Sequence, residues 1–280
     1  MIRRELSFMA ACLVSASAIV AGQATFRGGV DLVEVDVSVT RGNVPVANLT
    51  AANFLVTDNG DRQEVTAAKL DLPLRVTLVL DVSESVFGER LTGLVNASNG
   101  LVNALRADDQ ASLVTFSHSA RLRVPMTGSF DALRNALTSL SAGGGTALRD
   151  AVYLAMTAQG HEGTRRLLLI FSDGTDTASW LASAQVIAAA RRSSVVIHVV
   201  KFGIEEFLNR LASDTGGRTW SAGSNRQLEE LFTRALNEMR ARYVLTYSVR
   251  APNKPGWHKI QVGLRNASGD VTARPGYMAP

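Results

Sequence analysis

The chain has 280 residues, of which 46% are hydrophobic, so it is long enough and apolar enough to fold around a sizeable buried core. This composition excludes an intrinsically disordered chain. The formal net charge of +4 is too small for a protein of this length to indicate nucleic-acid binding. The single cysteine excludes an intrachain disulfide and a cysteine-rich metal site.

The first 24 residues have the features of a signal peptide. Two arginines precede an apolar run from Leu6 to Ala21, and Gly22 and Ala24 provide a small-x-small cleavage site. We expect cleavage after Ala24, which would leave a mature chain without cysteine. An exported protein without disulfides fits the bacterial periplasm, cell envelope or exterior.

Two alternatives to a cleaved signal peptide remain open. The run from Leu6 to Ala21 could be retained as an anchor, although it is shorter than the about 20 residues that a spanning helix needs. Cys12 could carry a lipid, but the apolar run continues well past it. With the signal removed, we expect no segment that spans a membrane.

The segment 28–72 has an all-β pattern. Apolar and polar residues alternate from Val30 to Thr40, which indicates a half-buried strand. Residues 54–65 predict a strand, a turn at Asn59-Gly60 and a second strand.

The segment 74–242 has a different pattern, in which continuous apolar runs alternate with helical periodicity. Such runs are typical of parallel strands that are buried on both faces. The predicted strands are 76–80, 111–116, 167–172 and 195–200. The predicted helices are 89–106, 130–140, 147–159, 179–192, 204–214 and 225–241. This alternation predicts a doubly wound, mostly parallel α/β domain.

The segment 243–278 returns to strand patterns, at 243–249 and 258–264, separated by a turn with proline and glycine. The two ends of the chain therefore resemble each other more than either resembles the middle. Our hypothesis is that they pair into one small β-sandwich, into which the α/β domain is inserted.

Short oxygen-bearing side chains follow two of the predicted parallel strands. Asp81, Ser83 and Ser85 stand at alternate positions after the first strand, and Asp173 follows a later one. Thr146 ends a glycine-rich loop at the start of a helix. Ligands of such sheets bind at the carboxyl ends of the strands, so we expect these five residues to converge there.

The predicted cluster offers hard oxygen donors, which suit Mg²⁺, and also Mn²⁺ or Ca²⁺. Two aspartates would balance the charge of a divalent cation, and the three neutral hydroxyls would leave it able to accept a carboxylate from outside. Each piece alone also has an ordinary interpretation: Asp81, Ser83 or Thr146 as a helix cap, and Asp173-Gly174 as a turn. The complete set, in this order, favours a metal site.

An enzymatic function lacks the residues that it would need. No histidine accompanies Ser83 by motif, the four histidines lack metal-ligand spacing, and the glycine loop lacks the lysine of a phosphate-binding loop. His198 lies within an apolar run and is predicted to be a core residue. Asp176 is predicted to cap a helix that begins near Ser179, and Asp108-Asp109 to form a turn.

These motifs resemble the von Willebrand factor type A (VWFA) domain and its metal-ion-dependent adhesion site (MIDAS), with coverage from about Leu74 to Arg242. Asp81, Ser83 and Ser85 match its first motif, Thr146 the second and Asp173 the third. The resemblance implies that the hydroxyls contact the metal, that the aspartates act directly or through water, and that an acidic group of a partner completes the coordination.

The two ends of the chain, 35–65 with 243–264 and 272–278, are similar to exported VWFA-related proteins of Acidobacteria. Glu84 departs from the family pattern, which usually has a small residue there, and we expect its side chain to face away from the site.

The sequence thus predicts an exported, non-enzymatic binding or adhesion module that engages a carboxylate of a protein partner through its metal. The alternative is a structural envelope component in which the metal only stabilises the fold.

Overall fold

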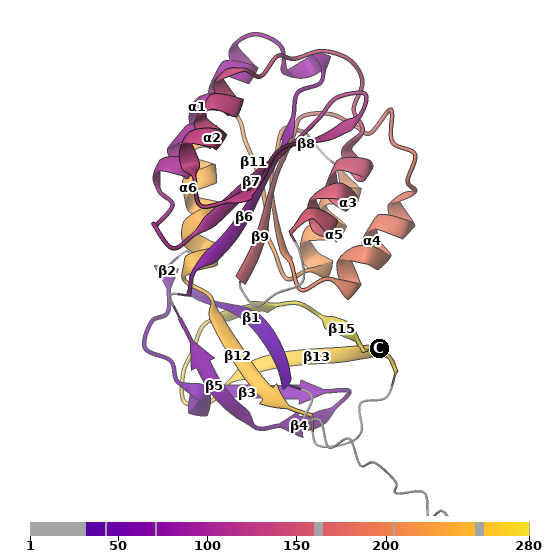
Figure 1. Cartoon of the computed structure of the whole chain (residues 1–280). Helices are drawn as coiled ribbons and strands as arrows, with labels where there is room; N and C mark the ends of the chain where they lie inside the picture. Colours follow the sequence, from indigo (N-terminus) through magenta and orange to yellow (C-terminus); the bar gives the residue numbers. More distant parts are fainter. Residues whose placement is uncertain are drawn as a thin grey trace, which may run out of the picture. The chain divides into compact units, whose positions relative to one another are not determined.

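The computed structural model describes residues 32–42, 44–70, 72–159, 165–203, 205–249 and 255–279 (Figure 1). The predicted signal peptide lies outside these residues. Among the helices that the described residues form, none is both long and apolar enough to cross a membrane.

A six-stranded sheet forms the middle of the α/β region, in the order β11-β10-β9-β6-β7-β8. All neighbouring pairs are parallel except β7 with β8, which is antiparallel. The predicted mostly parallel α/β sheet is therefore confirmed. The strands are β6 (Leu74–Asp81), β7 (Gln110–Phe116), β8 (Ala120–Thr127), β9 (Arg165–Ser172), β10 (Val196–Lys201) and β11 (Thr219–Ser221).

Three helices cover each face of this sheet (Figure 1). One face packs against α1 (Glu89–Asn103), α2 (Phe130–Thr138) and α6 (Arg226–Arg240). The other packs against α3 (Leu148–Ala158), α4 (Ser183–Arg192) and α5 (Glu206–Asp214).

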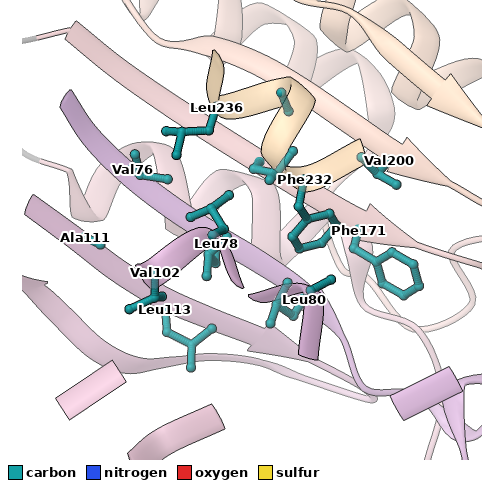
Figure 2. Close-up of a cluster of buried hydrophobic side chains, with 14 of the residues drawn as sticks. Val76, Leu78, Leu80, Val102, Ala111, Leu113, Phe171, Val200, Phe232 and Leu236 are labelled. Carbon is teal, nitrogen blue, oxygen red and sulfur yellow. The ribbon is translucent and has the colours of Figure 1, made fainter. Parts of the chain in front are cut away.

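The core on the first face is continuous from strand to helix. Figure 2 shows Leu78 and Leu80 of β6 beside Phe171 of β9, with Phe232 of α6 packed over them. All four side chains are fully buried, and each such burial stabilises the fold by about 1.5–3 kcal/mol. This core fixes the ends of β6 and β9, which carry the candidate site.

The structure departs from the predicted elements at β8, β11 and the start of α4. No strand was predicted at β8, because this edge strand exposes Arg121, Leu122 and Arg123 and so lacks a continuous apolar run. β11 has only three residues. The helix predicted at 179–192 begins at Ser183 instead, since the preceding backbone donates hydrogen bonds to the Asp150 carboxylate.

The two ends of the chain form two further sheets. The strands are β1 (Leu32–Arg41), β2 (Val44–Pro45), β3 (Phe54–Asp58), β4 (Asp61–Gln63), β5 (Val65–Lys69), β12 (Tyr243–Ser248), β13 (Gly256–Leu264), β14 (Asp270–Ala273) and β15 (Gly276–Ala279). One sheet has the order β14-β1-β12-β5, with β2 paired to β1, and the other has the order β15-β13-β3-β4.

Both sheets contain strands from both ends of the chain, since β1 pairs with β12 and β3 pairs with β13. Their apolar side chains share one buried cluster, which includes Val37, Phe54, Leu245 and Ile260. We call this part the β region. The hypothesis of a separate sandwich with an inserted domain, and its exact boundaries, stays a prediction.

Two arginines join the β region to the α/β region. Arg165 at the start of β9 pairs with Asp36 of β1 at 3.2 Å. Arg274, which follows β14, donates hydrogen bonds to the backbone oxygens of Arg191 and Ser193, at 3.0 and 2.8 Å. Burial lowers the pKa of both guanidinium groups, although Asp36 acts in the opposite direction.

Candidate metal site

The candidate site lies at the point where the strand order of the central sheet reverses. From β6 the chain continues to β7 on one side, and β9 lies on the other, so β6 and β9 flank the switch point of the sheet. Asp81 is the last residue of β6 and Asp173 directly follows β9. The two carboxylates therefore start from adjacent strand ends, at the edge where ligands of this architecture bind.

Asp81 is fully buried and held by both of its oxygens. Oδ1 accepts a hydrogen bond from the Ser83 backbone nitrogen at 2.9 Å, and Oδ2 accepts one from Ser172 Oγ at 2.8 Å. Burial raises the pKa of the Asp81 carboxyl, the hydrogen bonds from Ser83 and Ser172 oppose the shift, and the charge of Asp173 adds to it. The orientation of this carboxylate is therefore fixed by the protein.

The two serine hydroxyls lie next to each other and to Asp173. Ser83 Oγ is 3.1 Å from Ser85 Oγ, and Ser85 Oγ donates a hydrogen bond to Asp173 Oδ1 at 2.7 Å. Ser83 precedes a 3₁₀ turn (Glu84–Val86, labelled η2), but its side chain makes no capping hydrogen bond. The interpretation of Ser83 as a cap is therefore wrong.

The glycine-rich loop is hydrogen-bonded to the first motif. The Gly143 nitrogen donates to Val82 O at 2.9 Å, and the Glu84 nitrogen donates to Gly144 O at 3.0 Å. Gly144 has a φ of 83°, which favours glycine. The loop is thereby held against the segment that carries Ser83.

Thr146 ends this loop. A β-carbon at Gly174 would lie 3.8 Å from both Thr146 Oγ1 and Ser85 Oγ, so both hydroxyls lie near Gly174. Thr146 does not cap α3, whose N-cap position is Ala147 and has no side-chain hydrogen bond. Among the described residues, Thr146 Oγ1 makes no hydrogen bond, which leaves this oxygen free for a ligand.

Arg90 belongs to the site and was not predicted. Its guanidinium Nη1 pairs with Asp173 Oδ2, and its Cζ lies 4.6 Å from the centroid of the Phe202 ring. Arg90 is in the first turn of α1, where the helix dipole disfavours a cation. That unfavourable placement was the available sequence signal, and its partner could not be identified because Asp173 is 83 residues away.

Asp176 supports the loop next to the site. It accepts hydrogen bonds from the backbone nitrogens of Arg149 and Ser179, at 2.8 and 3.1 Å, and pairs with the Arg149 side chain. Burial alone would raise the pKa of Asp176, but these hydrogen bonds, with that from Ser179 Oγ, outweigh it and lower the pKa. Asp176 thus caps the start of α3, whereas the predicted helix near Ser179 is absent from this described segment.

Other predictions concern residues around the site. His198 is fully buried and accepts from the Arg218 nitrogen at Nδ1, with Nε2 at 2.6 Å from Glu238, so the prediction of a core histidine is confirmed. Asp109 is also structural, because it accepts hydrogen bonds from the Leu74 and Arg106 nitrogens. The side chain of Glu84 is exposed.

The donor atoms fit a small divalent cation. In an octahedron with bonds of about 2.1 Å, neighbouring ligand oxygens are about 3 Å apart, and the serine hydroxyls are separated by 3.1 Å. The described residues contain no group of three or more His, Cys, Asp or Glu that could hold a metal. A cation here would therefore depend on hydroxyl oxygens as well as on the two aspartates, and Mg²⁺, Mn²⁺ and Ca²⁺ accept such ligands.

Comparisons with known proteins give the class. Residues 76–175 match the family model of the von Willebrand factor type A domain. An uncharacterized protein of Synechocystis is 33% identical over 117 residues, which are 39% of this chain and 28% of that protein. The chain thus spans less than a third of the length of this relative.

Two solved structures share the fold. The von Willebrand factor type A structure from Catenulispora acidiphila has a TM-score of 0.55 at 13% identity, and covers 89% of this chain and 72% of its own. Proximal thread matrix protein 1 of the mussel byssus, with a zinc-occupied MIDAS motif, has a TM-score of 0.57 at 16% identity, and covers 66% of this chain and 50% of its own.

This chain contains a von Willebrand factor type A domain. Domains of this family bind a divalent metal at the MIDAS, mediate protein–protein interaction and adhesion, and are generally not enzymes.

Proposed function

We propose that this chain is an exported, non-enzymatic adhesion module that engages an acidic group of a partner protein through a divalent cation, Mg²⁺ in the first instance. The ligands would be Asp81, Ser83, Ser85, Thr146 and Asp173. The observation that carries the proposal is the convergence of these side chains from three segments at the switch point of the sheet.

The charges of the site favour an anionic partner. Two carboxylates, Asp81 and Asp173, would balance a divalent cation, and the Arg90 guanidinium beside Asp173 leaves one net positive charge in this group. The bound metal would supply a Lewis-acidic position for a carboxylate oxygen. The protein's own residues fix the aspartates, and Ser85 donates its hydrogen to Asp173, which leaves an oxygen lone pair for a cation.

Two exposed aromatic side chains near the site support a macromolecular partner. Phe87, two residues after Ser85, is 77% exposed, and Trp180, in the loop after Asp173, is 95% exposed. Both exceed every other large hydrophobic side chain of the described residues in exposure. Aromatic residues, Trp above all, are enriched among those that dominate binding energy at protein interfaces.

The surroundings of the serines support a non-enzymatic function. A serine nucleophile needs a base within hydrogen-bonding distance. In the described part of the chain, no histidine contacts Ser83 or Ser85, and His118 lies 3.4 Å from Ser117 Oγ instead.

Capture of partners from native envelope extract tests this proposal. Immobilised protein should retain a partner in Mg²⁺ and release it in EDTA, and Trp180→Ala should weaken retention. Tyr153→Ala, which changes another exposed aromatic residue on α3, is the matched control and should not. Retention that is insensitive to EDTA in folded protein would favour the structural alternative, in which the metal only stabilises the fold.

A further inference from the structure

A second feature of the metal-site edge is a cationic recess between the β7–β8 turn and the glycine-rich loop. It has a volume of about 320 Å³. The polar side chains that line it are those of Thr115, Ser117, His118, Ser119, Arg121, Arg123 and Ser141. None of the described aspartates or glutamates lines it.

The two arginines of this recess are available to an external anion. Both lie on β8, both line the recess, and both side chains are exposed. Arg123 donates to Ser139 Oγ at 3.3 Å, and within the described ranges neither guanidinium pairs with a carboxylate. Their charge is therefore not neutralised within the described part of the protein.

The recess lies beside the segments that carry the metal site. Val82 lines the recess and is the residue between Asp81 and Ser83, and Gly143 and Gly144 line it as well. A β-carbon at Gly144 would lie 3.1 Å from His118 Nδ1, while the oxygen of the same Gly144 accepts the Glu84 nitrogen. One loop thus separates the two features.

We propose that the partner of this domain presents an acidic segment with two carboxylates, one for the metal and a second for the recess, held by Arg121 and Arg123. This assignment rests on the proposed function and specifies its ligand. An extended chain advances about 3.3 Å per residue and alternates its faces, so two acidic residues an even number of positions apart, such as two or four, present both carboxylates to the same side. Guanidinium groups suit this role because they bind carboxylates with paired hydrogen bonds.

Short peptides test the assignment in the full-length protein. The probes are nine-residue Gly/Ser peptides with one Asp, or with a second Asp two or four positions away, and a control with Asn at that position. Titration into ¹⁵N-labelled protein with Mg²⁺, followed through backbone amides and the arginine Nε–Hε signals, detects weak binding. We expect the second Asp to lower Kd roughly three- to tenfold and to shift the Arg121 and Arg123 signals.

The variant Arg121→Gln/Arg123→Gln should abolish this gain and leave Kd of the one-Asp peptide within about twofold. Arg192→Gln/Arg234→Gln removes the same charge from α4 and α6 and should keep the gain. The assignment would be overturned if the second Asp still lowered Kd in the Arg121→Gln/Arg123→Gln variant. It would also be overturned if Asn at that position lowered Kd as much as Asp. Tighter, recess-dependent binding of a uronic-acid trisaccharide would overturn it as well, and would identify a saccharide instead.

Failure of the inference and failure of the proposed function give different results. If the one-Asp peptide binds in a Mg²⁺-dependent way and a second Asp adds nothing, only the recess assignment is wrong. If neither peptide gives Mg²⁺-dependent shifts, both are wrong. Shifts of the Arg121 and Arg123 signals that do not require Mg²⁺ would show that the recess binds anions independently of the metal. That result would overturn the proposal that one ligand binds to both the metal and the recess.

Discussion

Asp58 in the β region and Asp81 in the α/β region are both buried, but their surroundings differ. Asp58 accepts hydrogen bonds from Tyr247 Oη at 3.0 Å and Tyr277 Oη at 2.9 Å, and its Oδ1 lies 2.7 Å from His258 Nδ1. These partners lie on β12, β15 and β13 and link the two sheets. Burial, followed by the charge and hydrogen bond of Asp58, raises the pKa of Tyr247, which keeps it a donor.

Asp81 instead has further hydroxyls near it. Its two oxygens are held by Ser83 and Ser172. Ser83 Oγ lies next to Ser85 Oγ, and the hydroxyls of Ser85 and Thr146 both lie near Gly174. The two clusters thus differ in what surrounds the carboxylate: the partners of Asp58 hold it between two sheets, whereas the Asp81 cluster also contains hydroxyls that do not hold it. Changes in the two clusters should therefore affect different properties.

The largest expected effect on stability is at Asp58. Asp58→Ala removes the carboxylate that accepts from Tyr247 in the core and that pairs with His258, so the free energy of unfolding should fall by about 3–5 kcal/mol. Mg²⁺ affinity of the folded variant should not change. Urea denaturation measures the free energy of unfolding, and calorimetry measures the Mg²⁺ affinity. Asp61→Ala, in the exposed neighbouring strand, should change stability by less than about 0.5 kcal/mol. Loss of Mg²⁺ binding in a folded Asp58→Ala variant would contradict the expectation that the Asp58 cluster affects stability alone.

The opposite pattern is expected at Thr146. Thr146→Val replaces the hydroxyl by a methyl group of similar size, so Mg²⁺ affinity should fall at least about tenfold. The free energy of unfolding should change by less than about 1 kcal/mol, because Thr146 Oγ1 makes no hydrogen bond among the described residues. Thr146→Ser, which keeps a hydroxyl, should retain most of the affinity. A strongly destabilised Thr146→Val with normal Mg²⁺ binding would show that this hydroxyl is structural.

A smaller effect is expected at Arg90, whose charge opposes a cation beside Asp173. Arg90→Gln should raise Mg²⁺ affinity about two- to fivefold, since an ion pair whose arginine is 36% exposed contributes about 0.5–1 kcal/mol. It should also weaken binding of acidic peptides to the metal-loaded protein. Arg134→Gln breaks a more exposed Arg–Asp pair within α2 and serves as the control. Unchanged or lower Mg²⁺ affinity in Arg90→Gln would remove Arg90 from the site.

The sequence predicted the buried parallel strands because continuous apolar runs such as that of β6 are unambiguous. It did not predict β8, since an edge strand with Arg121 and Arg123 on its surface lacks this signal. The same limit applies to function. Motif spacing predicted the neighbourhood of Asp81, Ser83, Ser85 and Asp173, whereas Arg90 and the cationic recess depend on contacts between segments far apart in the chain.

Calorimetric titration with Mg²⁺ is the most direct test of the proposed metal site. The wild type and Asp81→Asn should be compared, because asparagine has the shape of aspartate and can still accept from the Ser83 nitrogen, so the fold should be retained. We expect one Mg²⁺ bound per wild-type chain and no binding to Asp81→Asn over the same range of concentration. Equal binding by the two folded proteins would contradict the assignment of Asp81 to the metal site.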